Sequence, residues 1–457
     1  MELDNKRVTV IGLGNSGYNA ALLLRSKGAL VKLSDATGLT TDAAKRVKAL
    51  EEKGIEVELG GHTESFIKSS DMIVVSPGVE CDSSPMKWSV KYHIPVIGEM
   101  ELGCRFCKGR IIAITGTNGK STVTKLIGEI LKNGGKDSVT CGNIGNCLCG
   151  EIERIKEDTW VALEVSSFQL ETIKSFKPAI SVILNITDDH MDRYKAFDDY
   201  YNQKLKIFAN QDAGDYLILN YDARNLRDLK SKAESTALYY STRKKVAGAY
   251  IDGGNIWCDF KGRREDICSV SDIPLRGMHN VENVLSAVLA CTAAGVDKDP
   301  IKNAIRNFKG LAHRIELVDT IEGVEYIDDS KGTTVDSTYR ALESCDRPVV
   351  LIAGGKDKHS DYSYVKDIVK KKVKAVVLIG EAAGPIKKSL KGSANIVEAG
   401  DMFEAVRMSH KIAKDGWTVL LSPMCSSFDM FSSYKERGDV FKKAVGMIRQ
   451  GLAQIKA

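Results

Sequence analysis

The clearest pattern along the chain is an alternation of short apolar runs with amphipathic stretches. Residues 7–11, 29–33 and 71–75 are apolar runs, and a helical spacing of apolar positions follows the first of them. Short apolar runs bounded by turn residues are typical of strands that a parallel sheet buries on both faces. The alternation of such strands with helices predicts a doubly wound sheet.

The same alternation restarts near residue 105 and again near residue 311. In the second region, strands are expected at residues 110–115, 160–164, 180–184 and 216–219, and helices at residues 121–132, 197–208 and 278–294. In the third region, strands are expected at residues 324–327, 349–352, 375–379 and 418–421. Residues 253–270 are polar and turn-rich, and they are assigned no strand. We therefore predict three α/β domains, at residues 1–104, 105–310 and 311–457.

A glycine-rich segment, Gly116-Thr-Asn-Gly-Lys-Ser-Thr122, follows the strand expected at residues 110–115 and opens a helix. In such a loop the backbone N–H groups and the helix N-terminus bind phosphates, the lysine reaches the terminal phosphates, and a hydroxyl holds Mg²⁺. The full phosphate-loop pattern has a glycine where Ile114 stands, so the match is partial. The position between a strand and a helix favours a nucleotide site over a plain turn.

A second glycine pattern, Gly12-x-Gly14-x-x-Gly17, follows the first strand, and Asp35 ends the second strand. The spacing suits a dinucleotide site in which the acidic residue contacts the ribose, and taken alone it indicates NAD. The pattern is weak by itself, because a glycine turn can simply allow a helix and a strand to pack closely. Another nucleotide on the same scaffold is equally permitted.

Acidic and imidazole side chains follow the strands of the second region. Glu164 ends one apolar strand, and His190 lies in the polar segment after the next strand. Ligands of parallel sheets bind at the carboxyl ends of the strands, so these two side chains are candidate Mg²⁺ ligands. The alternative is that they are solvated loop residues.

Lys204 occupies an unusual position, because its helical neighbours at the same face are apolar. These neighbours are Phe197, Tyr201, Leu205 and Phe208. A lysine on such a face loses hydration of its ammonium group, which favours the neutral amine and makes it chemically available. The alternative is that the long side chain extends out of the core to keep its charge in water.

Composition narrows the class of protein. The 457 residues are 43% hydrophobic and 27% charged with a formal net charge of +5, a profile typical of a globular protein without a nucleic-acid surface. No apolar run is long enough to cross a membrane, and the first residues do not resemble a signal peptide. The 11 cysteines are scattered, which favours reduced thiols and a cytoplasmic location.

Together these segments resemble the Mur ligases of peptidoglycan synthesis over nearly the whole chain. The marks of the resemblance are Gly116-Thr-Asn-Gly-Lys-Ser-Thr122, Gly142-Asn-Ile-Gly145, Glu164-Val-Ser-Ser-Phe-Gln-Leu-Glu171, Asp189-His-Met-Asp-Arg-Tyr194, Gly277-Met-His-Asn-Val-Glu-Asn283, His313-Arg314, Asp328-Asp-Ser-Lys-Gly-Thr333 and Ser422-Pro-Met-Cys-Ser-Ser-Phe428. So many segments in one order are far more specific than any one of them.

The resemblance implies an α/β fold of three domains. The N-terminal domain would be Rossmann-like and hold the UDP end of the substrate, and the central domain would be P-loop ATPase-like with a parallel sheet. The C-terminal domain would be Rossmann-like and receive the amino acid. The implied partners are the small molecules UDP-N-acetylmuramoyl-L-alanine, D-glutamate and ATP, with no nucleic acid, no membrane and a monomeric chain.

The resemblance also assigns roles to single residues. It implies catalytic roles for Lys120, Glu164, His190 and Lys204. Two Mg²⁺ ions would be held by Ser121, Glu164, His190 and Lys204, the lysine as its CO₂ adduct, a carbamate. ATP would be bound by Gly116, Thr117, Asn118, Gly119, Lys120, Ser121, Thr122, Asn283, Arg314 and Asp329.

The two remaining substrates have implied sites of their own. The UDP substrate would be bound by Asn15, Ser16, Asp35, Asn143, Ser166 and Gln169. D-glutamate would be bound by Lys331, Thr333, Lys358, Ser427 and Phe428. The segment Gly-Gly-Lys356-Asp-Lys358 permits either lysine in the last site, and we expect Lys358 there. Thr334 stands where an asparagine is common in the family, which leaves its local role open.

The implied reaction is phosphorylation of the substrate carboxylate by ATP, followed by attack of the D-glutamate amine on the acyl phosphate. Another Mur ligase or a folylpolyglutamate synthetase would share the central domain. The Gly12–Gly17 pattern argues against the folate enzyme, and the lack of an Asp-Asn-Pro-Arg-like segment argues against a ligase for a diamino acid. A dehydrogenase or a P-loop switch would not account for two nucleotide loops in one chain.

Overall fold

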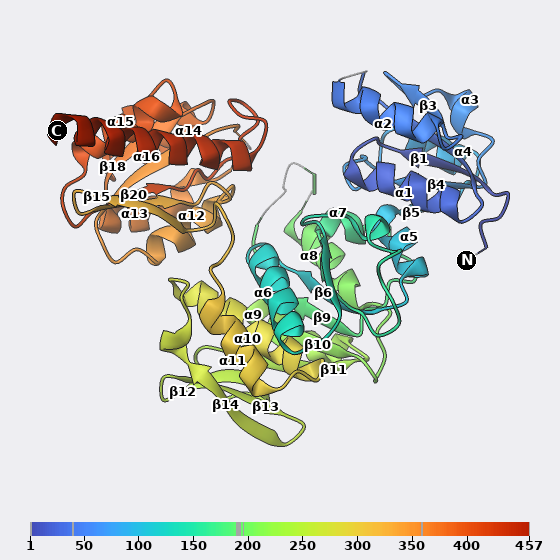
Figure 1. Cartoon of the computed structure of the whole chain (residues 1–457), viewed down its shortest axis with the longest axis horizontal. Helices are drawn as coiled ribbons and strands as arrows, with labels where there is room; N and C mark the ends of the chain where they lie inside the picture. Colours follow the sequence, from blue (N-terminus) through green and yellow to red (C-terminus); the bar gives the residue numbers. More distant parts are fainter. Residues whose placement is uncertain (1, 39–40, 189–192, 195, 358–359, 457) are drawn as a thin grey trace. The chain divides into compact units, whose positions relative to one another are not determined.

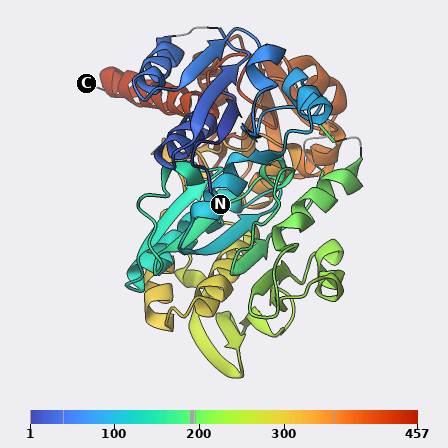
Figure 2. The same cartoon turned by 90° about the vertical axis from the view of Figure 1, so that its right-hand side faces the viewer.

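The computed structural model describes residues 2–38, 41–188, 193–194, 196–357 and 360–456. The chain forms two compact units, one made of Met1–Asp272 with Glu282–Arg306 and the other of Ile273–Val281 with Asn307–Ala457. Three β-sheets with flanking helices build these units (Figures 1 and 2). The expected α/β class with largely parallel sheets is confirmed, and the residue boundaries of the three domains stay a prediction.

The strands follow one another in regular alternation with helices over most of the chain. They are β1 Arg7–Ile11, β2 Leu30–Asp35, β3 Glu56–Leu59, β4 Met72–Val75, β5 Val96–Gly98, β6 Arg110–Thr115, β7 Ser138–Gly142, β8 Trp160–Glu164, β9 Ile180–Ile183, β10 Tyr216–Asn220, β11 Thr236–Ser241, β12 Gly248–Asp252, β13 Asn255–Phe260, β14 Arg263–Ser269, β15 Glu316–Ile321, β16 Val324–Asp328, β17 Val349–Gly354, β18 Val373–Ile379, β19 Asn395–Glu398 and β20 Thr418–Leu421. Every strand expected from an apolar run is present within a few residues of its expected bounds.

The α-helices fill the connections between these strands. They are α1 Asn15–Ser26, α2 Thr41–Glu51, α3 Glu64–Ile67, α4 Ser84–Lys91, α5 Glu99–Phe106, α6 Lys120–Asn133, α7 Ser167–Leu170, α8 Phe197–Leu205, α9 Arg224–Arg227, α10 Met278–Ala293, α11 Lys298–Asn307, α12 Val335–Glu343, α13 Lys366–Lys372, α14 Ala383–Ser389, α15 Met402–Ile412 and α16 Tyr434–Lys456. Within the described part of the chain, no helix is both long and apolar enough to cross a bilayer.

The first sheet has five strands in the order β3-β2-β1-β4-β5, and its strand pairs are parallel. β1 lies in the centre between β2 and β4, so the chain reverses its direction of winding there. In open sheets of this kind, ligands bind outside the carboxyl ends of the strands at such a reversal point. The glycine segment after β1 and Asp35 at the end of β2 therefore lie where a nucleotide is expected.

The second sheet has nine strands in the order β14-β13-β12-β11-β10-β9-β6-β8-β7. β6 is flanked by the parallel strands β8 and β9, with Ile114 opposite Glu164 and Thr115 opposite Ile183. This register brings the loops that follow the three strands to one edge of the sheet. The phosphate loop therefore opens between the segments that follow Glu164 and Ile183.

The second sheet differs from the expected parallel sheet at one end. Residues 253–270 contain β13 and β14, an antiparallel hairpin that pairs with β12 and lies at the bottom of Figures 1 and 2. The assignment of no strand there was wrong. β13 has buried Ile256 and Cys258 alternating with half-buried neighbours, and the charged residues at the start of β14 are largely exposed. An edge strand with one solvated face lacks the continuous apolar run that marks a buried strand.

The third sheet has six strands in the order β15-β16-β20-β17-β18-β19. β15 pairs with β16 antiparallel, and the other pairs are parallel. The central strands β17 and β20 are buried along their whole length, which explains their apolar sequences. The neighbouring strands β16, β20 and β17 end at the same edge, so the loops after them meet there.

Candidate active site

The phosphate loop connects β6 to α6 and depends on two glycines. Gly116 and Gly119 have φ angles of 156° and 88°, which side chains other than hydrogen rarely allow. A Cβ atom at Gly119 would lie 2.5 Å from Oδ1 of Asn283, a residue of α10. The loop is therefore closely packed against Asn283, and both belong to the residues expected at the ATP site.

The segment that follows β9 holds the phosphate loop in place. The backbone N–H of Thr117 donates to the carbonyl of Asn185 (2.9 Å), and the N–H of Asn118 donates to the Asn185 side chain (2.8 Å). The Asn185 amide in turn donates to the Asn118 carbonyl (3.1 Å), and the Thr117 hydroxyl donates to Thr187 (3.0 Å). The sequence reasoning assigned Asn185 no role. Its only signal was that an amide directly follows a buried strand.

Two lysines converge on one carbonyl of the phosphate loop. Nζ of Lys120 donates to the carbonyls of Gly116 (2.7 Å) and Thr117 (2.8 Å). Nζ of Lys204 also donates to the Gly116 carbonyl (3.0 Å). The same Nζ lies 4.7 Å from the ring centre of Tyr200. The two amines are therefore brought together at the phosphate loop, although they lie 84 positions apart in the sequence.

Lys204 is buried with only 2% of its surface exposed. Its apolar helical neighbours, including Tyr201 and Leu205, pack against the same hydrophobic core. The alternative in which the lysine extends into solvent is therefore excluded. The amine is held inside the protein beside the phosphate loop.

Glu164 lies at the end of β8, next to the phosphate loop in the sheet, and is 2% exposed. Its Oε1 accepts a hydrogen bond from the Asn143 side chain (2.8 Å), and its carbonyl accepts one from the Asn143 backbone (2.9 Å). Its Oε2 is buried and has no hydrogen-bond partner among the described residues. A buried carboxylate oxygen without a partner is costly, and a bound cation would remove that cost.

Of the other residues expected at the metal sites, Ser121 is among the described residues and His190 is not. Ser121 is buried in the first turn of α6, beside Lys120. His190 lies outside the described residues. The following Arg193 donates two hydrogen bonds to Glu171 (3.1 and 2.6 Å), and the Tyr194 hydroxyl donates a third (2.8 Å). Glu171 therefore fixes the chain immediately after the segment that contains His190.

The glycine segment after β1 forms a compact turn at the start of α1. A Cβ atom at Gly17 would lie 1.8 Å from the carbonyl of Gly12, so only glycine permits this packing. Asn15 and Ser16 begin α1, and the Asn15 carbonyl accepts a hydrogen bond from the Cys147 thiol (3.6 Å). The two polar residues expected near a pyrophosphate thus lie at a helix N-terminus, where anions are stabilised.

Asp35 borders a cavity of about 220 Å³ beside this turn. The cavity is lined by Leu13, Gly14, Asp35, Thr37, Gly38, Ala43 and Arg46. Burial alone would raise the pKa of Asp35, but the hydrogen bonds from the Leu13 and Thr37 backbone N–H groups outweigh it and hold the pKa below its ordinary value. The cavity therefore offers an anionic acceptor for sugar or base N–H and O–H groups, and the cationic Arg46 lines the same cavity.

Two further residues expected at the UDP substrate form a capping box at the start of α7. The Ser166 hydroxyl accepts from the Gln169 backbone (3.3 Å), and the Gln169 side chain accepts from the Ser166 backbone (2.9 Å). This reciprocal arrangement satisfies the first N–H groups of a helix. It explains these residue types locally, and their contact with a substrate stays a prediction.

In the second unit, Asp329 follows β16 and is 1% exposed. Its Oδ2 accepts a hydrogen bond from the Ser422 hydroxyl (2.8 Å), and Nη1 of Arg314 lies 3.9 Å from its Oδ1. Burial raises the pKa of Asp329 to about 6, although the nearby arginine opposes that shift. The structure thus pairs two of the residues expected at the ATP site.

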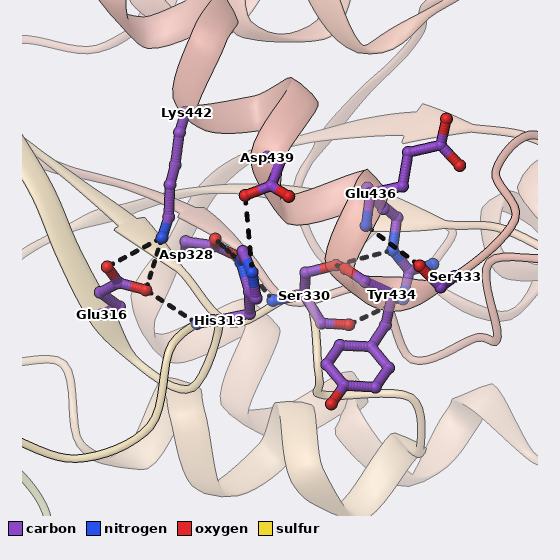
Figure 3. A network of polar contacts seen from close by, with 10 residues as sticks. His313, Glu316, Asp328, Ser330, Ser433, Tyr434, Glu436, Asp439 and Lys442 are labelled. Carbon is purple, nitrogen blue, oxygen red and sulfur yellow. Dashed lines mark hydrogen bonds and ion pairs between the residues drawn. The ribbon is translucent and has the colours of Figure 1, made fainter. Parts of the chain in front are cut away.

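A polar network holds the backbone next to Arg314 (Figure 3). Nδ1 of His313 lies 2.7 Å from Asp328, and the His313 N–H donates to Glu316 (2.8 Å). Both Glu316 oxygens accept hydrogen bonds from Lys442 (2.8 Å). His313, Glu316 and Asp328 are close enough to hold a metal ion, but the lysine ammonium already neutralises Glu316. We interpret the network as a support for Arg314.

The residues expected at D-glutamate lie on two loops of the second unit. Lys331 and Thr333 follow β16, with Nζ of Lys331 at 5.6 Å from the Tyr434 ring centre. Ser427 and Phe428 follow β20; the serine is buried and the phenylalanine is 73% exposed.

The choice between the two lysines after β17 remains untested. Lys358 lies outside the described residues. Lys356 is exposed and forms an ion pair with Glu381 (2.6 Å). The position of Thr334 is clear, because its hydroxyl accepts from the Ser337 N–H (3.2 Å) as the N-cap of α12. Asparagine serves as an N-cap equally well, which explains the exchange at this position.

The chain is similar over its whole length to proteins named UDP-N-acetylmuramoylalanine–D-glutamate ligase. It is 43% identical over 453 residues to the one from Pelotomaculum thermopropionicum, covering 98% of this chain and 99% of that one. It is 44% identical over 447 residues to the one from Koribacter versatilis, covering 97% and 98%. Sequence models also match residues 6–98 (Mur ligase MurD-like, N-terminal domain), 114–291 (Mur ligase middle domain) and 313–425 (Mur ligase, glutamate ligase domain).

The chain belongs to the Mur ligase family. Solved structures of other Mur ligases share its fold at low sequence identity. UDP-N-acetylmuramate-alanine ligase MurC from Thermotoga maritima matches with a TM-score of 0.60 and 17% identity, covering 97% of this chain and 100% of that one. MurF ligase from Thermotoga maritima, solved in complex with ADP, matches with a TM-score of 0.57 and 15% identity, covering 98% and 96%.

Membership of the Mur ligase family decides between the alternatives left open by the glycine patterns. A Mur ligase has two nucleotide-bearing substrates, which accounts for both patterns in one chain. The interpretation of the Gly12–Gly17 turn as an NAD site is therefore not adopted, and the dehydrogenase and switch alternatives are set aside.

Proposed function

We propose that the chain is an ATP-dependent, ADP-forming ligase that joins D-glutamate to UDP-N-acetylmuramoyl-L-alanine in peptidoglycan precursor synthesis. The observation that carries this proposal is the identity of 43–44% along the whole chain to proteins that bear this name. The proposed substrates are small molecules. We further propose that the enzyme works as a monomer in the cytoplasm, where ATP is available.

The proposed reaction begins with phosphorylation of the substrate carboxylate by ATP. A carboxylate is a poor electrophile, and phosphorylation converts one of its oxygens into a good leaving group. The amine of D-glutamate then attacks the acyl carbon, and phosphate departs from a tetrahedral intermediate. Most of the protein's contribution is positioning and neutralisation of charge. Lys120 at the phosphate loop supplies a cation that can follow the transferred phosphoryl group.

Two Mg²⁺ ions are proposed at the same edge of the second sheet. Ser121 and Glu164 would hold one, and His190 and Lys204, the latter as a carbamate, would hold the other. The buried Glu164 Oε2 without a partner among the described residues supports a cation at this place. Mg²⁺ would supply neutralisation of the phosphate charge, and its preference for oxygen ligands fits the donor set.

The function is tested by the choice of amino acid. Release of phosphate from ATP would be measured with UDP-N-acetylmuramoyl-L-alanine and, in turn, D-glutamate, L-glutamate, L-lysine, meso-diaminopimelate and glycine. Among these five amino acids, we expect only D-glutamate to give phosphate release above background. We expect no release when the UDP substrate is omitted. Release with a diamino acid instead would place the chain in another branch of the family and contradict the proposal.

The proposed UDP site is tested by Asp35→Asn. The carboxylate accepts hydrogen bonds from Leu13 and Thr37, and the asparagine amide would direct N–H groups at one of these donors. We expect the KM for the UDP substrate to rise about tenfold or more, while the KM for ATP stays within twofold, because an unpaired buried group costs ~1–3 kcal/mol. Glu56→Gln, at an exposed ion pair of the same sheet, is the matched control. Equal changes in both KM values would place Asp35 outside the UDP site.

A further inference from the structure

Arg437 is an unusual residue of α16, because its side chain is completely buried. Its Nε donates to the Ser330 hydroxyl (3.0 Å), and its Nη2 donates to the Ser330 carbonyl (2.8 Å). The Cys425 and Ser426 carbonyls accept from Nη2 and Nη1 (3.1 Å each). One guanidinium group thus joins the loop after β16 to the loop after β20.

A third loop meets the same guanidinium group. Gly355 follows β17, and a Cβ atom there would lie 3.0 Å from Nη1 of Arg437 and 2.3 Å from the Ser426 carbonyl. The N–H of Lys356 donates to that same carbonyl (2.9 Å). Because β16, β20 and β17 are neighbours in the sheet, the three loops open side by side at its carboxyl edge. The Arg437 side chain therefore contacts all three loops.

A fully buried guanidinium group is costly to place in a protein interior. The four hydrogen bonds that it donates end at carbonyl and hydroxyl oxygens, and the carboxylates of Asp328, Asp329 and Asp429 act on it without being hydrogen-bond partners in these four contacts. Burial accordingly lowers the pKa of Arg437 to about 10. An arginine buried at such a cost, with its donors spent on three loop carbonyls and a hydroxyl, fits a role in fixing the geometry of the loops that it joins.

We propose that Arg437 is the positioning residue of the amino-acid pocket, where it sets the three loops in register for a dicarboxylic amino acid. This inference rests on the proposed function. The loops that it joins carry Lys331 and Thr333 after β16 and Ser427 after β20, the residues assigned to D-glutamate. A hydrogen bond to the Ser426 carbonyl also polarises the peptide whose N–H belongs to Ser427, which strengthens that N–H as a donor.

A positioning role for Arg437 differs from a purely structural role in which measured quantities a substitution changes. A merely structural arginine would change stability and the kinetics of all substrates together. A positioning residue of one pocket changes the KM for the molecule bound there. Small displacements of positioning groups cost up to about 10²-fold in enzyme kinetics.

The test is Arg437→Lys in the full chain, assayed by phosphate release with each substrate varied in turn. The lysine keeps the charge but cannot join the loops with a planar fork. We expect the KM for D-glutamate to rise by ~10–100-fold and the KM for the UDP substrate to stay within twofold. The KM for ATP is expected to rise less than that for D-glutamate, because only the loop after β16, which also carries Asp329, is shared with the proposed ATP site. Arg449→Lys is the matched control on the same helix, since Arg449 is exposed and contacts β15. It is expected to behave as wild type.

Ser330→Ala provides a second, milder variant for the case in which Arg437→Lys does not fold. It removes the hydroxyl that accepts from Nε of Arg437 and donates to the Tyr434 carbonyl (2.7 Å, Figure 3). We expect the same selective rise in the KM for D-glutamate, by ~3–10-fold. Unchanged KM for D-glutamate in a folded variant, or equal changes for all three substrates, would overturn the inference. Absence of D-glutamate-dependent release by the wild-type chain would instead overturn the proposed function.

Discussion

Replacement of Lys120 by alanine is expected to lower kcat for phosphate release at least ~10³-fold. The lysine amine contacts the Gly116 and Thr117 carbonyls of the phosphate loop, where we propose that ATP binds. Contacts of this kind are strongest where charge moves during phosphoryl transfer, so their loss acts on kcat more than on KM. The measurement is steady-state phosphate release at saturating substrates.

The fold is expected to survive this substitution, because Lys120 is half-buried at the start of α6 and alanine is an excellent helix former. Thermal unfolding of Lys120→Ala would check that expectation. Lys132→Ala, at an exposed position in the last turn of the same helix, is the matched control and is expected to keep wild-type kcat. Retention of more than a tenth of wild-type turnover by Lys120→Ala would show that the loop is not the site of phosphoryl transfer.

Much of the fold could be predicted from the sequence because buried parallel strands have a strong local signature. β4 and β17 are buried at every residue, and both are continuous apolar runs. The prediction was wrong where this signature is absent. β13 and β14 form an edge hairpin whose pairing register shifts near Ile256, and residues 263–266 are charged. β15 was missed for a similar reason, since it is a partly exposed antiparallel edge strand.

Only the residues of the candidate site that lie within short sequence motifs could be predicted. Lys120 and Glu164 lie in segments whose residue types indicate phosphate and metal chemistry directly. Asn185 and Arg437 act through contacts with distant loops, and neither carries a local signal that distinguishes it from an ordinary polar residue. The pairing of Lys204 with the Gly116 carbonyl likewise depends on how α8 packs beside the phosphate loop. Such relations depend on tertiary structure.

Lys204 is expected to be indispensable, because we propose that it acts as a carbamate. The neutral amine nitrogen would attack the carbon of CO₂ and form an N–C bond, while one C=O π bond breaks and its electron pair moves to oxygen. One amine proton would then leave to solvent. The product is an anion with hard oxygen atoms, which suits a magnesium ion as an ammonium group cannot. This amine is buried beside the phosphate loop, at the edge of the sheet where the proposed magnesium sites lie.

Lys204→Ala should therefore lose nearly all activity, with a fall in kcat of ~10³-fold or more, while α8 remains folded because alanine is an excellent helix former. Lys206→Ala, two residues along the chain, is the control and should keep wild-type activity. Acetate or another small carboxylic acid should partly restore Lys204→Ala by placing an oxygen anion where the carbamate stood. Native mass spectra or ¹³CO₂ labelling of the wild-type enzyme should show one added CO₂, on this lysine alone.

Rescue of Lys204→Ala by a carboxylic acid and CO₂ labelling of the wild-type enzyme do not test the carbamate equally well. Failure of rescue by itself does not decide the question, since the cavity left by alanine can exclude the acid, so labelling and a structure of the active complex carry the decision. A plain, unmodified Lys204 ammonium in an active complex with both Mg²⁺ ions bound would contradict the carbamate. The contact of Lys204 with the Gly116 carbonyl would then be its working state, and the lysine would act as a second cation beside Lys120.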